Sequence, residues 1–134
     1  MYINETTGVV VFDLDGTLVD SKEFMVCSFT TTLEKHGFLF LSWDEFLTTC
    51  RGTSLERAYQ ILTGLSDVDF LCEEHRKWQA ANTEMVKLFP GVRETLEKIR
   101  ARGVLIALAT NRGSGAEEEL RRVGISKFFS AIRH

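Results

Sequence analysis

The sequence predicts an α/β protein in which a helical block interrupts an incomplete parallel β-sheet. Two short apolar runs, Gly8–Phe12 and Val104–Ala109, are rich in β-branched and aliphatic residues, which is typical of strands buried on both faces of a parallel sheet. The long segment between these runs has helical periodicity instead. The 134 residues are 44% hydrophobic and 26% charged, with a single proline, and this composition excludes a disordered or collagen-like chain.

Helices are predicted along the whole block that follows the first strand, from about residue 20 to residue 87. Each opens with a polar capping residue that is followed three positions later by an acid, which is the spacing of a helix N-terminus. Gly37 and Gly64 provide stops between helices. The four capping pairs are Asp20 with Glu23, Ser42 with Glu45, Thr53 with Glu56, and Ser66 with Asp69.

The remainder of the chain alternates between helix and strand. A helix is predicted from Val92 to the glycine stop at Gly103, and the second apolar run then forms a strand. Ser114 has capping spacing to Glu117 and opens another helix. Residues 128–132 have the composition of the approach to a third strand.

We therefore expect two domains. Residues 1–20 and 88–134 are predicted to form an α/β core, and residues 21–87 a helical insertion. A sheet averages about 5–6 strands, whereas this core supplies two clear strands and the start of a third. The core is predicted to be incomplete.

Composition also limits the partners of the protein. Sixteen basic and nineteen acidic residues give a net charge of −3, and no lysine–arginine block is present, so nucleic acid is not an expected partner. The apolar runs are far shorter than the roughly 20 residues that cross a bilayer, and no basic leader precedes the first strand. Cys27, Cys50 and Cys72 stand singly and are predicted to be free, buried thiols. We expect a cytoplasmic protein without a membrane or nucleic-acid partner.

Asp13 and Asp15 follow the first predicted strand. Because alternate residues project to the same side, their carboxylates are expected to converge at the carboxyl edge of the sheet, where open α/β folds bind ligands. Close carboxylates either share a proton or hold a divalent cation between them. Both arrangements suit phosphoryl transfer, in which one carboxylate attacks phosphorus and the other handles the proton of the leaving oxygen. A turn whose aspartates only cap backbone amides is the alternative.

The segment Val9–Ser21, which reads VVVFDLDGTLVDS, resembles the first signature of the haloacid dehalogenase-like hydrolases. The resemblance is to the phosphatase branch that includes phosphoglycolate phosphatase and β-phosphoglucomutase. It implies an incomplete Rossmann-like parallel sheet with an inserted α-helical cap. It also implies that Asp13 is the nucleophile that forms an aspartyl-phosphate and that Asp15 is the general acid and base. Both are implied ligands of Mg²⁺, Asp15 through its backbone carbonyl.

Two further segments are similar to features of the same family. Residues 105–111 resemble the second signature, in which a strand ends at a hydroxyl residue, so Thr110 and the Asn111 amide are implied phosphate-binding groups. The segment around Arg51 and Gly52 resembles the cap loop that faces the active site, which makes these residues candidates for binding an anionic substrate group. A solvated surface arginine is the alternative.

The two remaining signatures of the family, a lysine and an acidic pair, are expected beyond residue 134. Lys127 precedes the third predicted strand and is not given the lysine role. We therefore expect the front portion of a longer enzyme, weak or inactive by itself. A valine-rich edge of the first strand would then be open to self-association.

The predicted function is Mg²⁺-dependent hydrolysis of small phosphorylated metabolites through an aspartyl-phosphate. One alternative is a phosphomutase, which uses the same intermediate. Another is a truncated, non-catalytic module that retains phosphate or protein binding. Dinucleotide binding is disfavoured, because the glycines at 113 and 115 lack the third glycine of the fingerprint, where Glu118 stands.

Overall fold

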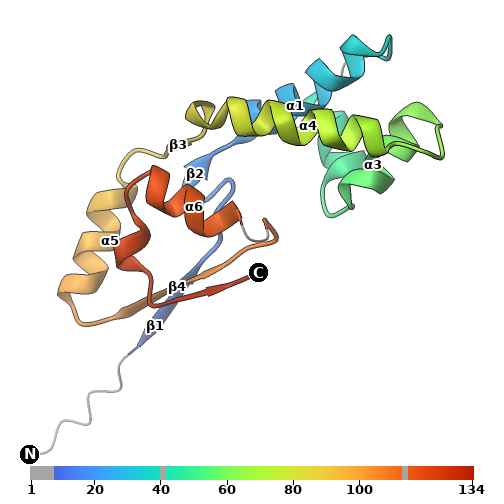
Figure 1. Cartoon of the computed structure of the whole chain (residues 1–134). Coiled ribbons are helices and arrows are strands. Elements are labelled where there is room, and N and C mark those ends of the chain that lie inside the picture. The colour runs from blue at the N-terminus through green and yellow to red at the C-terminus, as the bar shows by residue number, and fades with distance from the viewer. Residues whose placement is uncertain (1–7, 40–41, 113–114) are drawn as a thin grey trace, which may run out of the picture. The chain divides into compact units, whose positions relative to one another are not determined.

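The computed structural model describes residues 8–39, 42–112 and 115–134. It divides into two compact units (Figure 1), one made of Met1–Asp20 with Lys87–His134 and the other of Ser21–Val86. We call these the α/β unit and the helical unit and describe each by itself. The role of the helical insertion as a cap remains a prediction.

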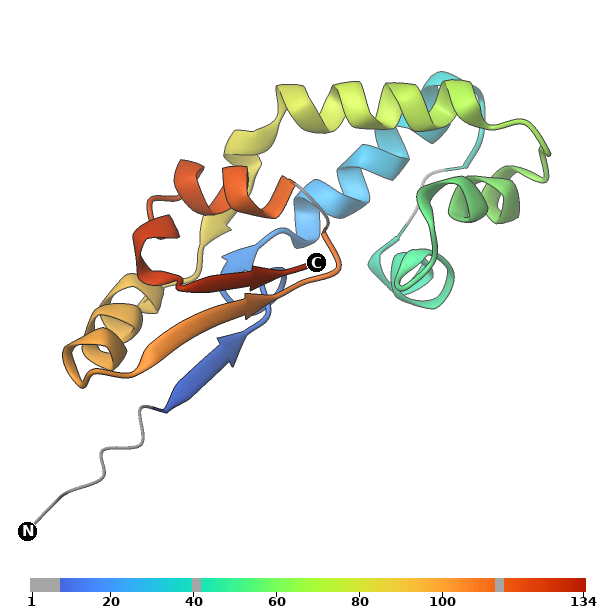
Figure 2. The ribbon, with the colours of Figure 1, turned by 60° about the horizontal axis from the view of Figure 1, so that its bottom comes forward.

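A parallel sheet, with three strands among the described residues, forms the centre of the α/β unit. Figure 2 shows its strands as blue, orange and dark red arrows. In the spatial order of the sheet they are β1 (Val9–Phe12), β4 (Leu105–Ala109) and β5 (Ala131–Arg133). All neighbouring strands run parallel. The predicted α/β class is confirmed, and the third strand forms at the end of the segment expected to lead to it.

Helical elements cover one face of this sheet. They are α5 (Val92–Ala101), α6 (Gly115–Arg122) and the 3₁₀ turn η3 (Ser126–Phe128). Helix α5 packs against β4, and η3 contacts both helices. Ser114, the predicted cap of α6, lies outside the described residues. The apolar side chains that become fully buried are Leu96, Ile106, Leu108, Ala116, Leu120 and Ile125.

The opposite face of the sheet is exposed in the described part of the chain. Val9 and Val11 of β1 are 56% and 60% exposed, and Leu105 beside them on β4 is 46% exposed. Strand β1 was expected to be buried on both faces, and this prediction is wrong for the described residues. The reason is that alternate side chains of a strand point to opposite faces, and no described element covers the face that these three residues share.

A small antiparallel ribbon marks where the chain leaves and re-enters the α/β unit. Its strands are β2 (Val19–Asp20) and β3 (Lys87–Leu88), with Val19 opposite Leu88. The Phe89 amide donates to the Leu18 carbonyl over 3.0 Å and extends the pairing. The two ends of the helical insertion are therefore held side by side.

The described residues of the helical unit form six elements, and α1 packs against α4 (Figure 1). They are α1 (Lys22–Lys35), α2 (Trp43–Glu45), the π-helical turn η1 (Phe46–Cys50), α3 (Leu55–Thr63), α4 (Asp69–Ala81) and the 3₁₀ turn η2 (Thr83–Met85). One apolar cluster fills the space between them. Its buried members are Phe29, Leu33, Phe46, Cys50, Ala58, Tyr59, Val68, Leu71 and Cys72.

One of the four predicted caps in this unit forms. The Ser42 hydroxyl accepts from the Glu45 amide over 3.3 Å, and the Glu45 carboxylate accepts from the Ser42 amide over 2.8 Å. The other three are wrong, because α1, α3 and α4 begin after Ser21, Ser54 and Val68. Asp20, for example, lies in β2, one residue before the N-cap of α1.

The state of the cysteines and the lengths of the apolar helices agree with most of the predictions made from composition. All three cysteines are free, with Cys50 and Cys72 buried, whereas Cys27 is only half-buried. Burial raises the pKa of the Cys50 thiol to about 11, which makes it a poor nucleophile at neutral pH. Among the described residues, no helix has both the length and the apolar character needed to cross a membrane.

Candidate functional site

The parallel register brings the two sequence signatures to one edge of the sheet. Phe12, the last residue of β1, pairs with Leu108 of β4. Asp13 therefore follows β1, and Thr110 follows β4, at the same carboxyl edge, which is where open α/β sheets bind ligands. We call Asp13, Asp15, Thr110, Asn111 and Arg112 the carboxyl-edge site.

The loop after β1 is anchored by the residue between the two aspartates. Leu14 is completely buried, and its carbonyl accepts from the amides of Leu18 and Val19 over 2.9 and 3.1 Å. Gly16 takes a positive φ of 79°, a conformation that strains residues with a side chain. The buried leucine and the tight turn leave both aspartates on the outer side of the loop.

The two aspartates differ in their surroundings. Asp13 is exposed, and its Oδ1 accepts from the Leu14 amide over 2.8 Å. Asp15 is 22% exposed and is held in an ion pair by Arg112. Asp13 thus presents a carboxylate to solvent at the sheet edge, whereas Asp15 is oriented by a cation.

Thr110 is the most buried residue of the carboxyl-edge site. Only 7% of its surface is exposed, and its amide donates to the Arg133 carbonyl over 3.0 Å. Its hydroxyl oxygen accepts from the Arg112 amide over 3.1 Å, so the hydroxyl proton points away from that bond. Asn111 is exposed on the same loop.

Arg112 is a residue of this site to which the sequence signatures gave no role. Its Nε donates to Asp15 Oδ2 over 3.1 Å and its Nη2 to Asp15 Oδ1. Its Nη1 lies 3.7 Å from Oε2 of Glu119 on α6. The one available signal was its position directly after the predicted phosphate-binding residues.

Arg51 and Gly52 lie in the helical unit, on an exposed turn after η1. The Arg51 amide donates to the Phe46 carbonyl over 3.0 Å, and Gly52 takes a positive φ of 74°. The turn is therefore well defined within its own unit. That it faces the two aspartates remains a prediction.

The fit of Mg²⁺ to the carboxyl-edge site is partial. Carboxylate and carbonyl oxygens are the donors that Mg²⁺ prefers, and Asp13 offers such a carboxylate at the edge. Both side-chain oxygens of Asp15 are bonded to Arg112. Within residues 8–39, 42–112 and 115–134, no group of three potential metal-ligating side chains comes together. The donors are right in kind but too few.

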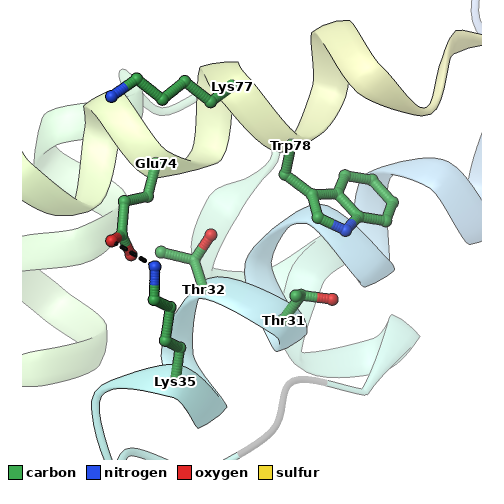
Figure 3. A pocket seen from close by; sticks show the side chains of 6 residues that line it. All are labelled: Thr31, Thr32, Lys35, Glu74, Lys77 and Trp78. Atoms are coloured by element: carbon green, nitrogen blue, oxygen red, sulfur yellow. Dashed lines mark hydrogen bonds and ion pairs between the residues drawn. The ribbon is translucent and has the colours of Figure 1, made fainter.

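A hollow of about 400 Å³ on the helical unit offers no second reactive site. Figure 3 shows Trp78 and Thr31 on its wall and the ion pair between Lys35 and Glu74, whose atoms are 2.7 Å apart. Lys77, also on the wall, pairs with Glu73 over 2.8 Å. Because both lysines are paired with acids, the hollow has little charge left for an anionic ligand.

Comparison with known proteins supports the family resemblance. Residues 10–134 match the family model described as haloacid dehalogenase-like hydrolase. The chain is 31% identical over 133 residues to a phosphoglycolate phosphatase of Agrobacterium fabrum, covering 92% of this chain and 57% of that protein. It is 26% identical to a phosphorylated carbohydrates phosphatase of Thermotoga maritima, covering 92% of this chain and 59% of that protein.

The fold is also that of a solved structure. A crystal structure described as a predicted phosphoglycolate phosphatase from Haemophilus somnus superposes with a TM-score of 0.83 at 24% identity. The match covers 95% of this chain and 61% of that one. The chain thus spans less than two thirds of the length of the proteins it matches.

Proposed function

Because this chain belongs to the haloacid dehalogenase-like hydrolase family, we propose that it hydrolyses small phosphomonoesters at the carboxyl-edge site, weakly as this chain alone. The observation that carries the proposal is the shared edge, where Asp13 and Asp15 follow β1 and Thr110 follows β4. The names of two relatives, a phosphoglycolate phosphatase and a phosphorylated carbohydrates phosphatase, support small phosphorylated metabolites as the substrate class.

The chemistry uses the two aspartates in different roles. A carboxylate oxygen of Asp13 attacks phosphorus, the bond from phosphorus to the ester oxygen breaks, and Asp15, in its protonated form, gives its proton to the leaving alcohol. Asp15 then takes a proton from water as that water attacks the aspartyl-phosphate, which releases phosphate and regenerates Asp13. Thr110 and the Asn111 amide would bind the phosphate oxygens. Mg²⁺, held by the Asp13 carboxylate and the Asp15 backbone carbonyl, would offset the phosphate charge.

We expect slow turnover of p-nitrophenyl phosphate by the full chain with added Mg²⁺, and its loss when EDTA removes the metal. The incomplete donor set predicts that half-maximal activity needs more Mg²⁺ than a site with three carboxylates would. Release of p-nitrophenolate over a Mg²⁺ series measures both. If EDTA left the rate of p-nitrophenolate release unchanged, the proposed role of Mg²⁺ would be wrong.

A non-catalytic binding module is the second candidate. Two observations favour it: the chain spans 57% of the phosphatase it resembles, and the described residues gather no group of three metal ligands. Phosphate binding without turnover at any Mg²⁺ concentration would select this candidate. A phosphomutase would instead pass the phosphoryl group from Asp13 to a sugar phosphate.

The acidic charge balance and the free cysteines support a cytoplasmic setting without nucleic-acid or membrane partners.

Self-association through the unpaired edge of the sheet is part of the proposal. Strand β1 is an edge strand among the described residues, and Val9, Val11 and Leu105 expose apolar surface beside that edge. We expect the chain to form dimers or larger species as its concentration rises, and Val11→Lys to shift it toward monomer, because a lysine on an edge strand opposes pairing.

Light scattering over a concentration series measures this. Ile61→Lys is the matched control, since Ile61 is 50% exposed on α3 in the other unit. A monomer at every concentration, or an equal effect of the two lysines, would contradict self-association through β1.

A further inference from the structure

Arg112 connects the loops that follow β1 and β4. Its guanidinium bonds both carboxylate oxygens of Asp15, a residue 97 positions earlier in the chain. Its own amide donates to the Thr110 hydroxyl oxygen over 3.1 Å. One residue therefore contacts the side chains of the proposed general acid and of the proposed phosphate-binding residue.

The Arg112 guanidinium also has an acidic neighbour on helix α6. Nη1 of Arg112 lies 3.7 Å from Glu119, whose side chain is only 7% exposed. Glu119 also accepts from Arg122 Nε over 3.2 Å and from Arg122 Nη2. The side chains of Asp15, Arg112, Glu119 and Arg122 form a series of ion pairs that alternates in charge. The negative charge of the nearly buried Glu119 is therefore compensated by an arginine on each side.

This arrangement restricts Arg112 more than a surface ion pair would. Its side chain is 18% exposed and that of Asp15 22%, whereas exposed pairs with mobile side chains fix little. A bidentate guanidinium–carboxylate pair sets the direction of both groups as well as their distance. Because Nη1, the third nitrogen of the guanidinium, lies near Glu119, helix α6 also helps to set the orientation of Asp15.

We propose that Arg112 is a positioning residue that couples the two loops, so that Asp15 and Thr110 are presented to the same phosphate group. The inference rests on the proposed function, in which one phosphate group contacts residues of both loops at once. Proton transfer by Asp15 requires one carboxylate oxygen to face the leaving group. A guanidinium with five donors can yield that oxygen and keep its bond to the other.

The first test follows the Arg112 Nε proton by NMR in the ¹⁵N-labelled full chain, with its signal assigned through Arg112→Lys. We expect Nε–H of Arg112 to exchange slowly with water in the wild type. In Asp15→Ala its exchange should be at least about tenfold faster, because the hydrogen bond that protects it from water would be lost. Nε–H of Arg122, which donates to Glu119, is the internal reference and should keep its protection. Unchanged exchange of Arg112 in Asp15→Ala would overturn the proposal.

The second test titrates the same protein with inorganic phosphate. In the wild type, amide signals of residues 13–20 and 110–112 should shift together with one dissociation constant. In Arg112→Gln, we expect the affinity to fall about tenfold and residues 13–20 no longer to respond. Arg112→Lys should restore part of the response, because it keeps the charge but not the fork.

Arg93→Gln is the matched control. It removes an arginine of the same unit that donates to the Gly124 and Val123 carbonyls, and it should leave both loops responsive. A joint response in Arg112→Gln equal to that of the wild type would overturn the proposal. If phosphate shifts neither loop in the wild type, the proposed function fails, and the Nε–H exchange still decides the positioning role.

Discussion

Asp13→Asn should reduce the turnover of p-nitrophenyl phosphate by roughly 10³-fold or more, the loss expected when a covalent nucleophile is removed. An amide oxygen lacks the negative charge needed to attack phosphorus and cannot form the acyl phosphate. The substitution should preserve the fold, because Asp13 is exposed and its one local hydrogen bond is accepted from the Leu14 amide, a bond that an asparagine oxygen can also accept. Release of p-nitrophenolate at saturating Mg²⁺ measures the change.

Asp44→Asn is the control for loss of a carboxylate as such. Asp44 is exposed on α2 in the helical unit, and its substitution should leave turnover within about twofold, as for a surface change without a buried partner. Equal turnover by Asp13→Asn and the wild type would remove Asp13 from the mechanism. The shared edge of β1 and β4 would then need another function.

The parallel sheet could be predicted from local composition, but its coverage could not. The apolar runs containing Val9 and Val11 indicate strands because β-branched residues fit a pleated backbone. An unbroken run does not reveal whether both faces are covered, since that depends on elements that pack from elsewhere. The exposure of Val9 and Val11 is therefore a tertiary property. The ribbon of β2 and β3 has two residues in each strand, too few to show any periodicity.

The positions at which helices begin could also be predicted only where the contacts are local in sequence. The Ser42 cap could be predicted because both of its partners are local in sequence. Asp20 has the same spacing to Glu23, but its backbone pairs with Lys87 in the ribbon, a contact that no local pattern contains. Helix α1 therefore begins after Ser21.

The carboxyl-edge site divides in the same way. Asp13, Asp15 and Thr110 stand in recognisable segments at the ends of predicted strands, so their common edge follows once the strands are parallel. The contact between Arg112 and Asp15 depends on β1 lying directly beside β4. Strand composition does not specify which strands are neighbours, and an arginine in a loop is more often solvated than paired.

A buried histidine in the helical unit should make that unit sensitive to acid. His75 is 3% exposed, and its ring lies edge-on to Phe29 with 4.6 Å between centroids. The Tyr59 hydroxyl lies 2.9 Å from His75 Nδ1. Burial, with a smaller contribution from the charge of Arg76, lowers the pKa of His75 from its ordinary 6.5 to about 4.

The sign of the pH effect follows from that direction. Between about pH 6.5 and pH 4 the unfolded chain protonates His75 while the folded chain leaves it neutral. The stabilising contribution is thus complete above pH 6.5 and is lost as the pH falls toward 4. A difference of this size corresponds to about 3 kcal/mol in the free energy of unfolding of the helical unit.

Tryptophan fluorescence isolates this unit, because both tryptophans of the chain, Trp43 and Trp78, belong to it. Urea unfolding of the full chain followed by fluorescence should show the free energy of unfolding falling by about 3 kcal/mol more in the wild type than in His75→Gln between pH 6.5 and 4. Glutamine keeps a polar partner for Tyr59 but does not titrate. His134→Gln, in the α/β unit, should retain the full pH dependence. If His75→Gln retained it as well, groups other than His75 would cause the acid sensitivity, and the prediction would be contradicted.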